Sequence, residues 1–279
     1  MLLPQFYVDD IIKTALQEDI NYLDTTTDLM IPATARSTAR FMAKAEGVVC
    51  GLEVALRVFE LLDPTFSYEI RLPEGSRVAY GDIIAELEGS TRCLLKGERT
   101  ALNLLQHMSG VASATDRYVR LVEGTRAAIT DTRKTLPGLR ALQKYAVTVG
   151  GGKNHRFNLS DGAMLKDNHI DACGSITKAV STLRSKIGHT VKIEVETRNL
   201  DEVAEALATG CEIIMLDNMD CETMKKAVEM TNGKALLEAS GNITAETIRK
   251  VAETGVDIIS IGALTHSVKA FDISLKIAK

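Results

Sequence analysis

The sequence predicts an α/β protein built from a small α+β domain followed by a series of parallel β/α units. Three observations carry this prediction. The chain has 279 residues, 45% hydrophobic and 25% charged, and this ordinary globular composition excludes wholesale disorder. Residues 40–88 hold short alternating runs separated by turns, which is typical of a sheet. From residue 127 onward, apolar strand runs alternate with single amphipathic helices, which indicates βαβ units.

Four of the strand runs end in a polar or small residue: Glu196, Asp217, Ser240 and Gly262. These positions are 21, 23 and 22 residues apart, about one β/α unit each. In a closed β/α barrel the carboxyl ends of the strands face one mouth, which would also hold Arg133, Lys134 and Lys166. An open doubly wound sheet is the competing architecture, but no G-x-G-x-x-G opens a helix here. About six or seven strand runs are visible rather than eight, which favours an incomplete or irregular barrel.

The helices and the domain boundary follow from the same patterns. Apolar residues at helical spacing predict a helix over residues 9–20, a short helix over 54–62, and a long helix over about 96–122 that is broken or bent near Ser109 and Gly110. We place an N-terminal domain at residues 1–110, including the linking helix, and a barrel domain with the active site at residues 111–279. We expect the last helix of the chain to pack back on the N-terminal domain.

The charge balance and the amino terminus exclude several classes of protein. Lys and Arg total 33 against 37 Asp and Glu, a formal net charge of −4, whereas a sequence-independent nucleic-acid binder needs a basic excess. The opening MLLPQFYVDD lacks the regions of a secretory signal, and no apolar run is long enough for a membrane span. We therefore predict a cytoplasmic protein that binds neither nucleic acid nor membrane. The five cysteines form no C-x-x-C pair, so we interpret them as reduced packing residues.

Cationic and donor side chains gather in two segments of this acidic chain. In DTRKTLPGLR, residues 131–140, Arg133 and Lys134 stand where a strand ends and a helix begins, which favours anions. GGGKNHR and DGAMLKDNH together supply a larger group: Lys153, His155, Arg156, Lys166 and His169. We expect the three consecutive glycines to let the backbone pass close to a ligand. Such a site suits a polyanion that carries phosphates and carboxylates.

Two acids and two small-residue turns complete the predicted mouth. Glu196 and Asp217 can bind sugar hydroxyls, hold Mg²⁺ through oxygen ligands, or stabilise a developing positive charge. Alternatively, they pair with Lys166 or Lys134 in a structural network. The segments EASGNIT and SIGALTHS offer backbone N–H groups of the kind that bind a terminal phosphate. Together these features describe a site for a sugar phosphate with additional negative groups.

The order and spacing of the motifs resemble those of quinolinate phosphoribosyltransferase. The matching segments are GERTALNLLQHMSGVAS, DTRKTLPGLR, KYAVTVGGGKNHR, LSDGAMLKDNHI, EVE, IIMLDN, LEASGNI and ISIGALTHS. The resemblance spans nearly the whole chain and implies an N-terminal α/β open-faced sandwich followed by an irregular parallel α/β barrel of TIM type. It implies transfer of phosphoribosyl from 5-phosphoribosyl 1-diphosphate to the ring nitrogen of quinolinate, with Mg²⁺. The implied products are nicotinate mononucleotide, diphosphate and CO2, in de novo NAD synthesis.

The resemblance also implies a role for each matching residue and a homodimer, with further assembly into hexamers left open. A carboxylate clamp for quinolinate would consist of Arg133, His155, Arg156 and, donated by the partner subunit, Arg99. The implied catalytic residues are Lys134 and Lys166 near the diphosphate, and Glu196 and Asp217 at the ribose, where they would also contact Mg²⁺ held mainly by the diphosphate. Thr132 belongs to the loop of Arg133. The two phosphate-binding turns would be Ser240, Gly241 and Asn242, and Ile261, Gly262 and Ala263.

Two positions depart from the family's pattern, and rival functions remain open. Asn158 stands where glycine is expected, and Gln143 stands where acidic residues are frequent; neither change removes a ligand group. The rivals are a related barrel protein with another substrate, such as a molybdenum-transport homologue or a monocarboxylate phosphoribosyltransferase, a Schiff-base aldolase using Lys166, and a non-catalytic nucleotide sensor. Three arginines at the predicted clamp favour a dicarboxylate over a monocarboxylate.

Overall fold

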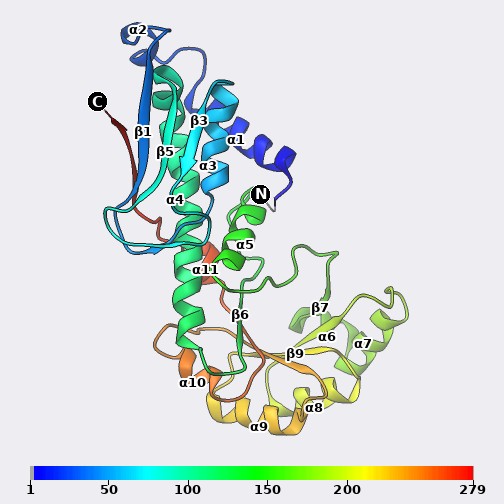
Figure 1. Ribbon diagram of the computed structural model, residues 1–279. Coiled ribbons are helices and arrows are strands. Elements are labelled where there is room, and N and C mark those ends of the chain that lie inside the picture. Colours follow the sequence, from blue (N-terminus) through cyan, green and yellow to red (C-terminus); the bar gives the residue numbers. More distant parts are fainter. Residues whose placement is uncertain (1–2, 279) are drawn as a thin grey trace. The chain divides into compact units, whose positions relative to one another are not determined.

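The computed structural model describes residues 3–278 and divides into two compact units (Figure 1). Unit 1 is built from Met1–Asp116, Thr135–Gly151 and Leu264–Lys279, and unit 2 from Arg117–Lys134 and Gly152–Ala263. The chain therefore passes between the units more than once. No helix among the described residues is both long enough and apolar enough to span a membrane.

Unit 1 contains a four-stranded antiparallel sheet. Its order is β12 (Ile273–Ala278), β1 (Arg36–Ala43), β5 (Ile83–Ser90) and β3 (Ser67–Ile70). Along β1 the buried residues Ala39, Phe41 and Ala43 alternate with more exposed ones, because successive side chains of a strand point to opposite faces. A second, two-stranded sheet pairs β2 (Gly47–Val48) with β4 (Arg77–Val78).

Six helices belong wholly or mainly to unit 1. They are α1 (Gln5–Asp19), α2 (Thr27–Met30), α3 (Leu52–Leu62), α4 (Thr91–Leu121), α5 (Arg140–Val149) and α11 (Ala263–His266). The predicted helices near residues 9–20 and 54–62 correspond to α1 and α3, with ends displaced by a few residues. On α3, Leu56 and Phe59 are buried one turn apart, as expected for an amphipathic helix packed on a sheet.

Two details of unit 1 correct the sequence-based expectations. Helix α4 is continuous through Ser109 and Gly110 rather than broken there. A Cβ atom at Gly110 would lie 2.4 Å from the carbonyl oxygen of Lys269, so this glycine allows a close approach between chain segments. After the last helix, α11, which falls mainly in unit 1, the chain continues into a strand that the sequence analysis did not predict. In this strand, β12, Ile273, Leu275 and Ile277 alternate with polar residues, and it pairs with β1.

Unit 2 contains a six-stranded parallel sheet. The strands are β6 (Ala128–Thr130), β7 (Ala163–Leu165), β8 (Ile193–Thr197), β9 (Ile213–Asp217), β10 (Leu236–Ser240) and β11 (Ile258–Ser260). Their order is β6-β11-β10-β9-β8-β7. From β7 to β11 the order advances in one direction, as in a β/α barrel, whereas a doubly wound sheet reverses direction midway. This order removes the open doubly wound alternative.

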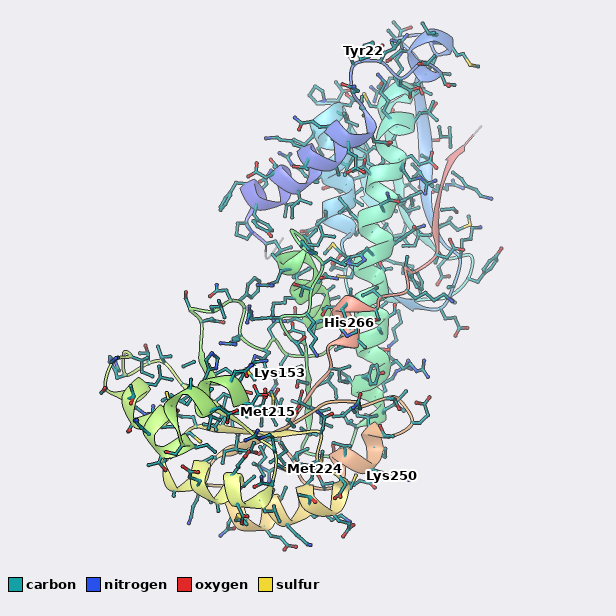
Figure 2. All side chains as sticks on the ribbon, turned by 180° about the vertical axis from the view of Figure 1, so that it is seen from behind. Tyr22, Lys153, Met215, Met224, Lys250 and His266 are labelled. Carbon is teal, nitrogen blue, oxygen red and sulfur yellow. The ribbon has the colours of Figure 1, made fainter. Side chains whose placement is uncertain are left out.

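Helices connect the strands of unit 2. They are α6 (Asp167–Cys173), α7 (Ile176–Arg184), α8 (Leu200–Ala208), α9 (Cys221–Thr231) and α10 (Ile248–Ala252). Figure 1 shows α7, α8 and α9 following one another along one side of the strand layer. In Figure 2 Met215 of β9 lies among the strands, while Met224 of α9 and Lys250 of α10 lie on the surrounding helices. The predicted fold class, an N-terminal sheet domain with a parallel α/β domain, is confirmed.

Candidate active site

One cavity of unit 2, of about 340 Å³, is lined by residues from or next to all six parallel strands. The sheet therefore curves round this cavity, as expected for an irregular barrel. Nine of the predicted site residues line it: Thr132, Arg133, Lys134, His155, Arg156, Lys166, Glu196, Asp217 and Ser240. Four further residues complete the lining: Met164, Met215, Glu238 and Ser260. We refer to this cavity as the strand-end pocket.

Buried Asp131 positions the segment that carries His155. Its carboxylate accepts hydrogen bonds from the side chain of Asn154, at 2.7 Å, and from the backbone N–H of His155, at 2.9 Å. Just before them, Lys153 forms a parallel bridge with Thr130, and its N–H donates to the carbonyl of Ile129 at 2.8 Å. The segment therefore runs alongside β6 like a short extra strand, and it directs His155 toward the interior of the sheet.

Two guanidinium groups give the strand-end pocket its positive side. Arg133 and Arg156 line the same cavity, and burial, followed by the charge of Arg133, lowers the pKa of Arg156. Arg156 also donates from Nη1 to the carbonyl of Gly162 at 3.0 Å, which fixes its direction. A pair of neighbouring guanidiniums in one cavity is a strong site for carboxylates or phosphates.

Carboxylates face this positive side from β8 and β9. Glu196 Oε2 lies 3.9 Å from Lys166 Nζ. Burial raises the pKa of Glu196; Lys166 opposes that shift, and the nearby charge of Asp217 adds to it. Lys166 and Glu196 thus form the contact that the structural alternative anticipated, while both remain part of the pocket lining.

The turn after β10 is tied to Asp217 through Asn218. The side-chain nitrogen of Asn218 donates to Asp217 Oδ2 at 2.9 Å, its Oδ1 accepts from Asn242 at 3.0 Å, and its backbone N–H donates to the carbonyl of Ser240 at 2.9 Å. Gly241 has a φ of +95°, and a Cβ there would lie on Asn218. Neither Gly241 nor Asn242 lines the pocket, but the two help to hold Asp217 at its edge.

The sequence analysis missed two buried acids that lie next to His155. His155 Nε2 lies 3.1 Å from Glu194 Oε2 and 3.6 Å from Glu238 Oε1. The two carboxylate side chains are only 6% and 2% exposed. Their signal was present in the sequence, since Glu194 and Glu238 precede Glu196 and Ser240 by two residues and so point to the same face of their strands.

The comparisons with known proteins match this architecture over nearly the whole chain. Residues 24–109 match the model of the quinolinate phosphoribosyl transferase N-terminal domain, and residues 111–276 match that of the C-terminal domain. The chain belongs to the quinolinate phosphoribosyltransferase family. It is 43% identical to the nicotinate-nucleotide pyrophosphorylase [carboxylating] of Mycobacterium leprae, with 95% of each chain covered. It is 41% identical to quinolinate phosphoribosyltransferase [decarboxylating] 2b, mitochondrial, of Nicotiana tabacum, covering 98% of this chain and 83% of that one.

Solved structures of the family share the fold closely. The crystal structure of NadC from Streptococcus pyogenes superposes with a TM-score of 0.96 at 43% identity, covering 100% of both chains. The structure of the nicotinate-nucleotide pyrophosphorylase from Francisella tularensis superposes with a TM-score of 0.93 at 39% identity, covering 99% of this chain and 98% of that chain. The predicted family is therefore confirmed.

Several residues assigned by the family resemblance lie outside the strand-end pocket. Arg99 is exposed on α4 in unit 1. The turn Ile261, Gly262 and Ala263 follows β11, where the N–H of Ile261 donates to the carbonyl of Thr130 at 3.0 Å. Gly241 and Asn242 also lie outside its lining, as do Lys153 and His169 of the cationic cluster that the sequence predicts.

The first glycine of the triple-glycine motif has a structural explanation. A Cβ at Gly150 would lie 2.4 Å from the carbonyl oxygen of Ala112, so Gly150 allows α5 to end against α4 within unit 1. None of the three glycines lines the pocket. The expectation that they let the backbone pass close to a ligand is therefore not met there.

Proposed function

We propose that the strand-end pocket is the place where this protein transfers phosphoribosyl from 5-phosphoribosyl 1-diphosphate to quinolinate, releasing diphosphate and CO2 and leaving nicotinate mononucleotide. The observation that carries this proposal is that one cavity is lined by two guanidiniums and two carboxylates. The guanidiniums are those of Arg133 and Arg156, and the carboxylates are those of Glu196 and Asp217. The cations match a dicarboxylate substrate, and the acids match a sugar on which positive charge develops. Family membership supplies the reaction, a step of de novo NAD synthesis.

The clamp orients quinolinate. Arg133 and Arg156 bind its carboxylates, since a planar guanidinium matches a carboxylate with two parallel hydrogen bonds. His155 lies beside Arg156, whose N–H donates to His155 Nδ1 at 2.7 Å. Arg99 of the partner subunit completes the clamp in a homodimer, and assembly of dimers into hexamers is left open.

The strand-end acids and lysines act on the sugar. Glu196 and Asp217 hold the ribose hydroxyls and stabilise positive charge at the anomeric carbon as diphosphate leaves, while Lys134 and Lys166 neutralise the diphosphate. Thr132 fixes the loop of Lys134, since its hydroxyl accepts the N–H of Lys134 at 3.0 Å. The turns Ser240–Asn242 and Ile261–Ala263 bind the 5-phosphate. The ring nitrogen carries no proton to remove, so transfer needs no general base and no covalent enzyme intermediate.

The carboxylates at the ends of β8 and β9 fit the Mg²⁺ that the family implies. Glu196 and Asp217 line the same pocket from neighbouring strands, and the charge of Asp217 adds to the rise that burial causes in the pKa of Glu196. Both offer the oxygen ligands that Mg²⁺ prefers, and substrate diphosphate would supply most of the others. When bound, Mg²⁺ would neutralise charge on the diphosphate.

Three further assignments stand as predictions. The domain boundary lies near residue 110, the protein acts in the cytoplasm, and its ligands are small molecules rather than nucleic acid. Expression of residues 111–279 alone would test the first of them, since a boundary near residue 110 predicts that this fragment folds without residues 1–110.

The test is an assay of purified protein with 5-phosphoribosyl 1-diphosphate and Mg²⁺, comparing quinolinate with nicotinate and following mononucleotide and CO2. We expect product from quinolinate alone, with one CO2 for each mononucleotide. Turnover of nicotinate, or a borohydride-trapped covalent adduct at Lys166, would refute the proposal in favour of a reused scaffold.

A further inference from the structure

The proposed reaction consumes one proton that the predicted site residues do not account for. After the ring nitrogen has bonded to the anomeric carbon and diphosphate has left, the bond between C2 and its carboxylate breaks. CO2 departs and the electron pair of that bond stays on C2. Nicotinate mononucleotide carries hydrogen at C2, so a proton must be delivered there. A delivered proton requires an acid that faces the ring.

We infer that Glu238 is this acid, a catalytic residue that donates a proton from its side chain to C2 and is left as a carboxylate, to be reprotonated from solvent after product leaves. The inference rests on the proposed function and deepens it. Glu238 lies on β10 two residues before Ser240, so both side chains face the strand-end pocket, with Glu238 at greater depth.

Position within the pocket favours Glu238 over the other acids. It lines the pocket together with the clamp residues Arg133, His155 and Arg156, and its Oε1 is 3.6 Å from His155 Nε2. The clamp holds the carboxylates of quinolinate, one of which is attached to C2, so C2 lies on the clamp side. The strand-end acids Glu196 and Asp217 are instead assigned to the ribose.

The groups around Glu238 raise its pKa toward neutral pH. They are Glu194 on β8, His155 beside β6, Asp131 after β6, Ser260 on β11 and, on β9, the uncharged Met215. Burial, and then the charge of Glu194, raise the pKa of Glu238 to about 7, and His155 and the hydroxyl of Ser260 only partly oppose this shift. Its Oε1 is buried without a hydrogen-bond partner among the described residues. A carboxyl in this state is suited to donate a proton.

Glu194 provides a matched control. It belongs to the same buried cluster, bonds to the same histidine, and does not line the strand-end pocket. Removing its charge in E194Q takes away one cause of the raised pKa of Glu238. The acid therefore remains in E194Q but loses its proton at lower pH.

The test compares wild type, E238Q and E194Q with saturating substrates and Mg²⁺, in pH profiles of kcat and in single turnovers that follow diphosphate, CO2 and mononucleotide separately. In wild type we expect kcat to fall above about pH 7, and the three products to appear together. In E238Q we expect that pH dependence to vanish and kcat to fall by about 100-fold or more. Diphosphate should appear well before mononucleotide, because transfer itself needs no proton.

The control and the contrary outcomes are distinct. E194Q should release its three products together, as wild type does. Its kcat should also fall as pH rises, but the fall should begin at a lower pH than in wild type. If E238Q keeps the wild-type rate and profile, or if all its products are slowed equally, Glu238 is not the acid and Lys134, Lys166 or water supplies the proton. If E238Q does not fold, the variant E238D is tested instead. E238D must show the same fall of kcat with rising pH at a lower overall rate, and a kcat of E238D that lacks this fall would overturn the assignment. Failure of wild type to make mononucleotide would instead refute the proposed function.

Discussion

At the scale of single residues, Asn218 shows how a side chain outside the pocket can set the geometry inside it. It has a φ of +53° and joins Asp217 to Asn242 and Ser240 through three hydrogen bonds. Asp217 thereby has one carboxylate oxygen fixed by Asn218. A carboxylate that must meet a sugar in one orientation benefits from such restraint.

We predict that N218G lowers kcat/KM for 5-phosphoribosyl 1-diphosphate by about tenfold, the scale of a lost hydrogen bond to a charged group. Glycine accepts a positive φ, so this variant removes the side chain without straining the backbone. The KM for quinolinate should change little. Steady-state kinetics with each substrate varied in turn measures both values, and an unchanged kcat/KM would show that Asp217 is oriented without Asn218.

A second prediction concerns the clamp. R133A should raise the KM for quinolinate by about tenfold or more, because a carboxylate loses a charge-assisted partner in a partly buried cavity. The variant K250A serves as control, since it removes a cation from the exposed surface of α10 and should leave both KM values unchanged. Equal behaviour of the two variants would contradict the assigned role of Arg133.

The residues that the sequence analysis missed share a physical reason. Attention to the polar residue at or next to the end of each strand found Glu196, Asp217 and Ser240, which line the pocket. Glu194 and Glu238 lie two residues earlier, and this spacing indicates only that they share a strand face with Glu196 and Ser240, not that neighbouring strands bring both acids to one histidine. Their juxtaposition depends on strand order, which no local pattern contains.

At the scale of elements, the segment that carries His155 depends on one buried carboxylate. Asp131 accepts from Asn154 and from the N–H of His155, and so docks this segment against β6. In D131N an NH2 group replaces one carboxylate oxygen of Asp131. We expect this NH2 group to face a donor that the carboxylate accepts in wild type, either the side chain of Asn154 or the N–H of His155. The free energy of unfolding should fall by about 1.5–3 kcal/mol.

D131N should also lower kcat/KM for quinolinate more than kcat/KM for 5-phosphoribosyl 1-diphosphate. The reason is that the clamp residues His155 and Arg156 directly follow Asn154 in the segment that Asp131 holds. Denaturant titration and steady-state kinetics check the two effects. D161N is the control, because Asp161 accepts the N–H of Phe157 at the exposed end of the loop. Equal losses of activity in the two variants would show that Asp131 does not direct the segment.

The elements also show where sequence patterns are sufficient. The long helix α4 repeats its apolar spacing and is predictable, and β9 is a run of four apolar residues that ends in Asp217. The bend predicted near Gly110 was wrong because glycine there serves a contact with Lys269, 159 positions along the chain (269 − 110). The final strand was missed because its partner β1 lies near the opposite end of the sequence.

At the scale of the whole molecule, the proposed role of Arg99 predicts that the site is completed by a second chain. Arg99 is exposed on unit 1, while the strand-end pocket belongs to unit 2. We predict that R99A and K166A are each inactive and that mixing them restores up to about a quarter of wild-type activity. Random exchange makes half of the dimers mixed, and each mixed dimer has one intact site.

Subunit exchange must be demonstrated separately, for example by native mass spectrometry of tagged chains. A mixture of R99A and E196A should recover activity in the same way, whereas K166A mixed with E196A should not, because both changes affect the same pocket. No recovery despite proven exchange would mean that Arg99 does not act across the dimer.

The buried acid at position 238 also makes the stability of the whole fold depend on pH. The pKa of Glu238 rises from 4.5 to about 7 on folding, so between these values the folded protein binds more protons at this site than the unfolded chain. The free energy of unfolding therefore falls as pH rises through this window, by about 3 kcal/mol in total, and the contribution is constant above it. In E238Q the side chain at position 238 is uncharged at every pH, so this pH-dependent fall in the free energy of unfolding is absent.

We predict that the difference in Tm between E238Q and wild type grows from about pH 4.5 to about pH 7 and favours E238Q above that range, measured by scanning calorimetry. E212Q should behave in the opposite way. Burial of Glu212 raises its pKa, but hydrogen bonds from Arg184 and from the N–H of Ile193 outweigh burial and lower it overall. E212Q should therefore be less stable than wild type at neutral pH, and its deficit should shrink as acid protonates Glu212. A difference between E238Q and wild type that does not vary with pH would show that Glu238 keeps the same charge in the folded and unfolded chain, and this result would also remove the proton that we assign to it in catalysis.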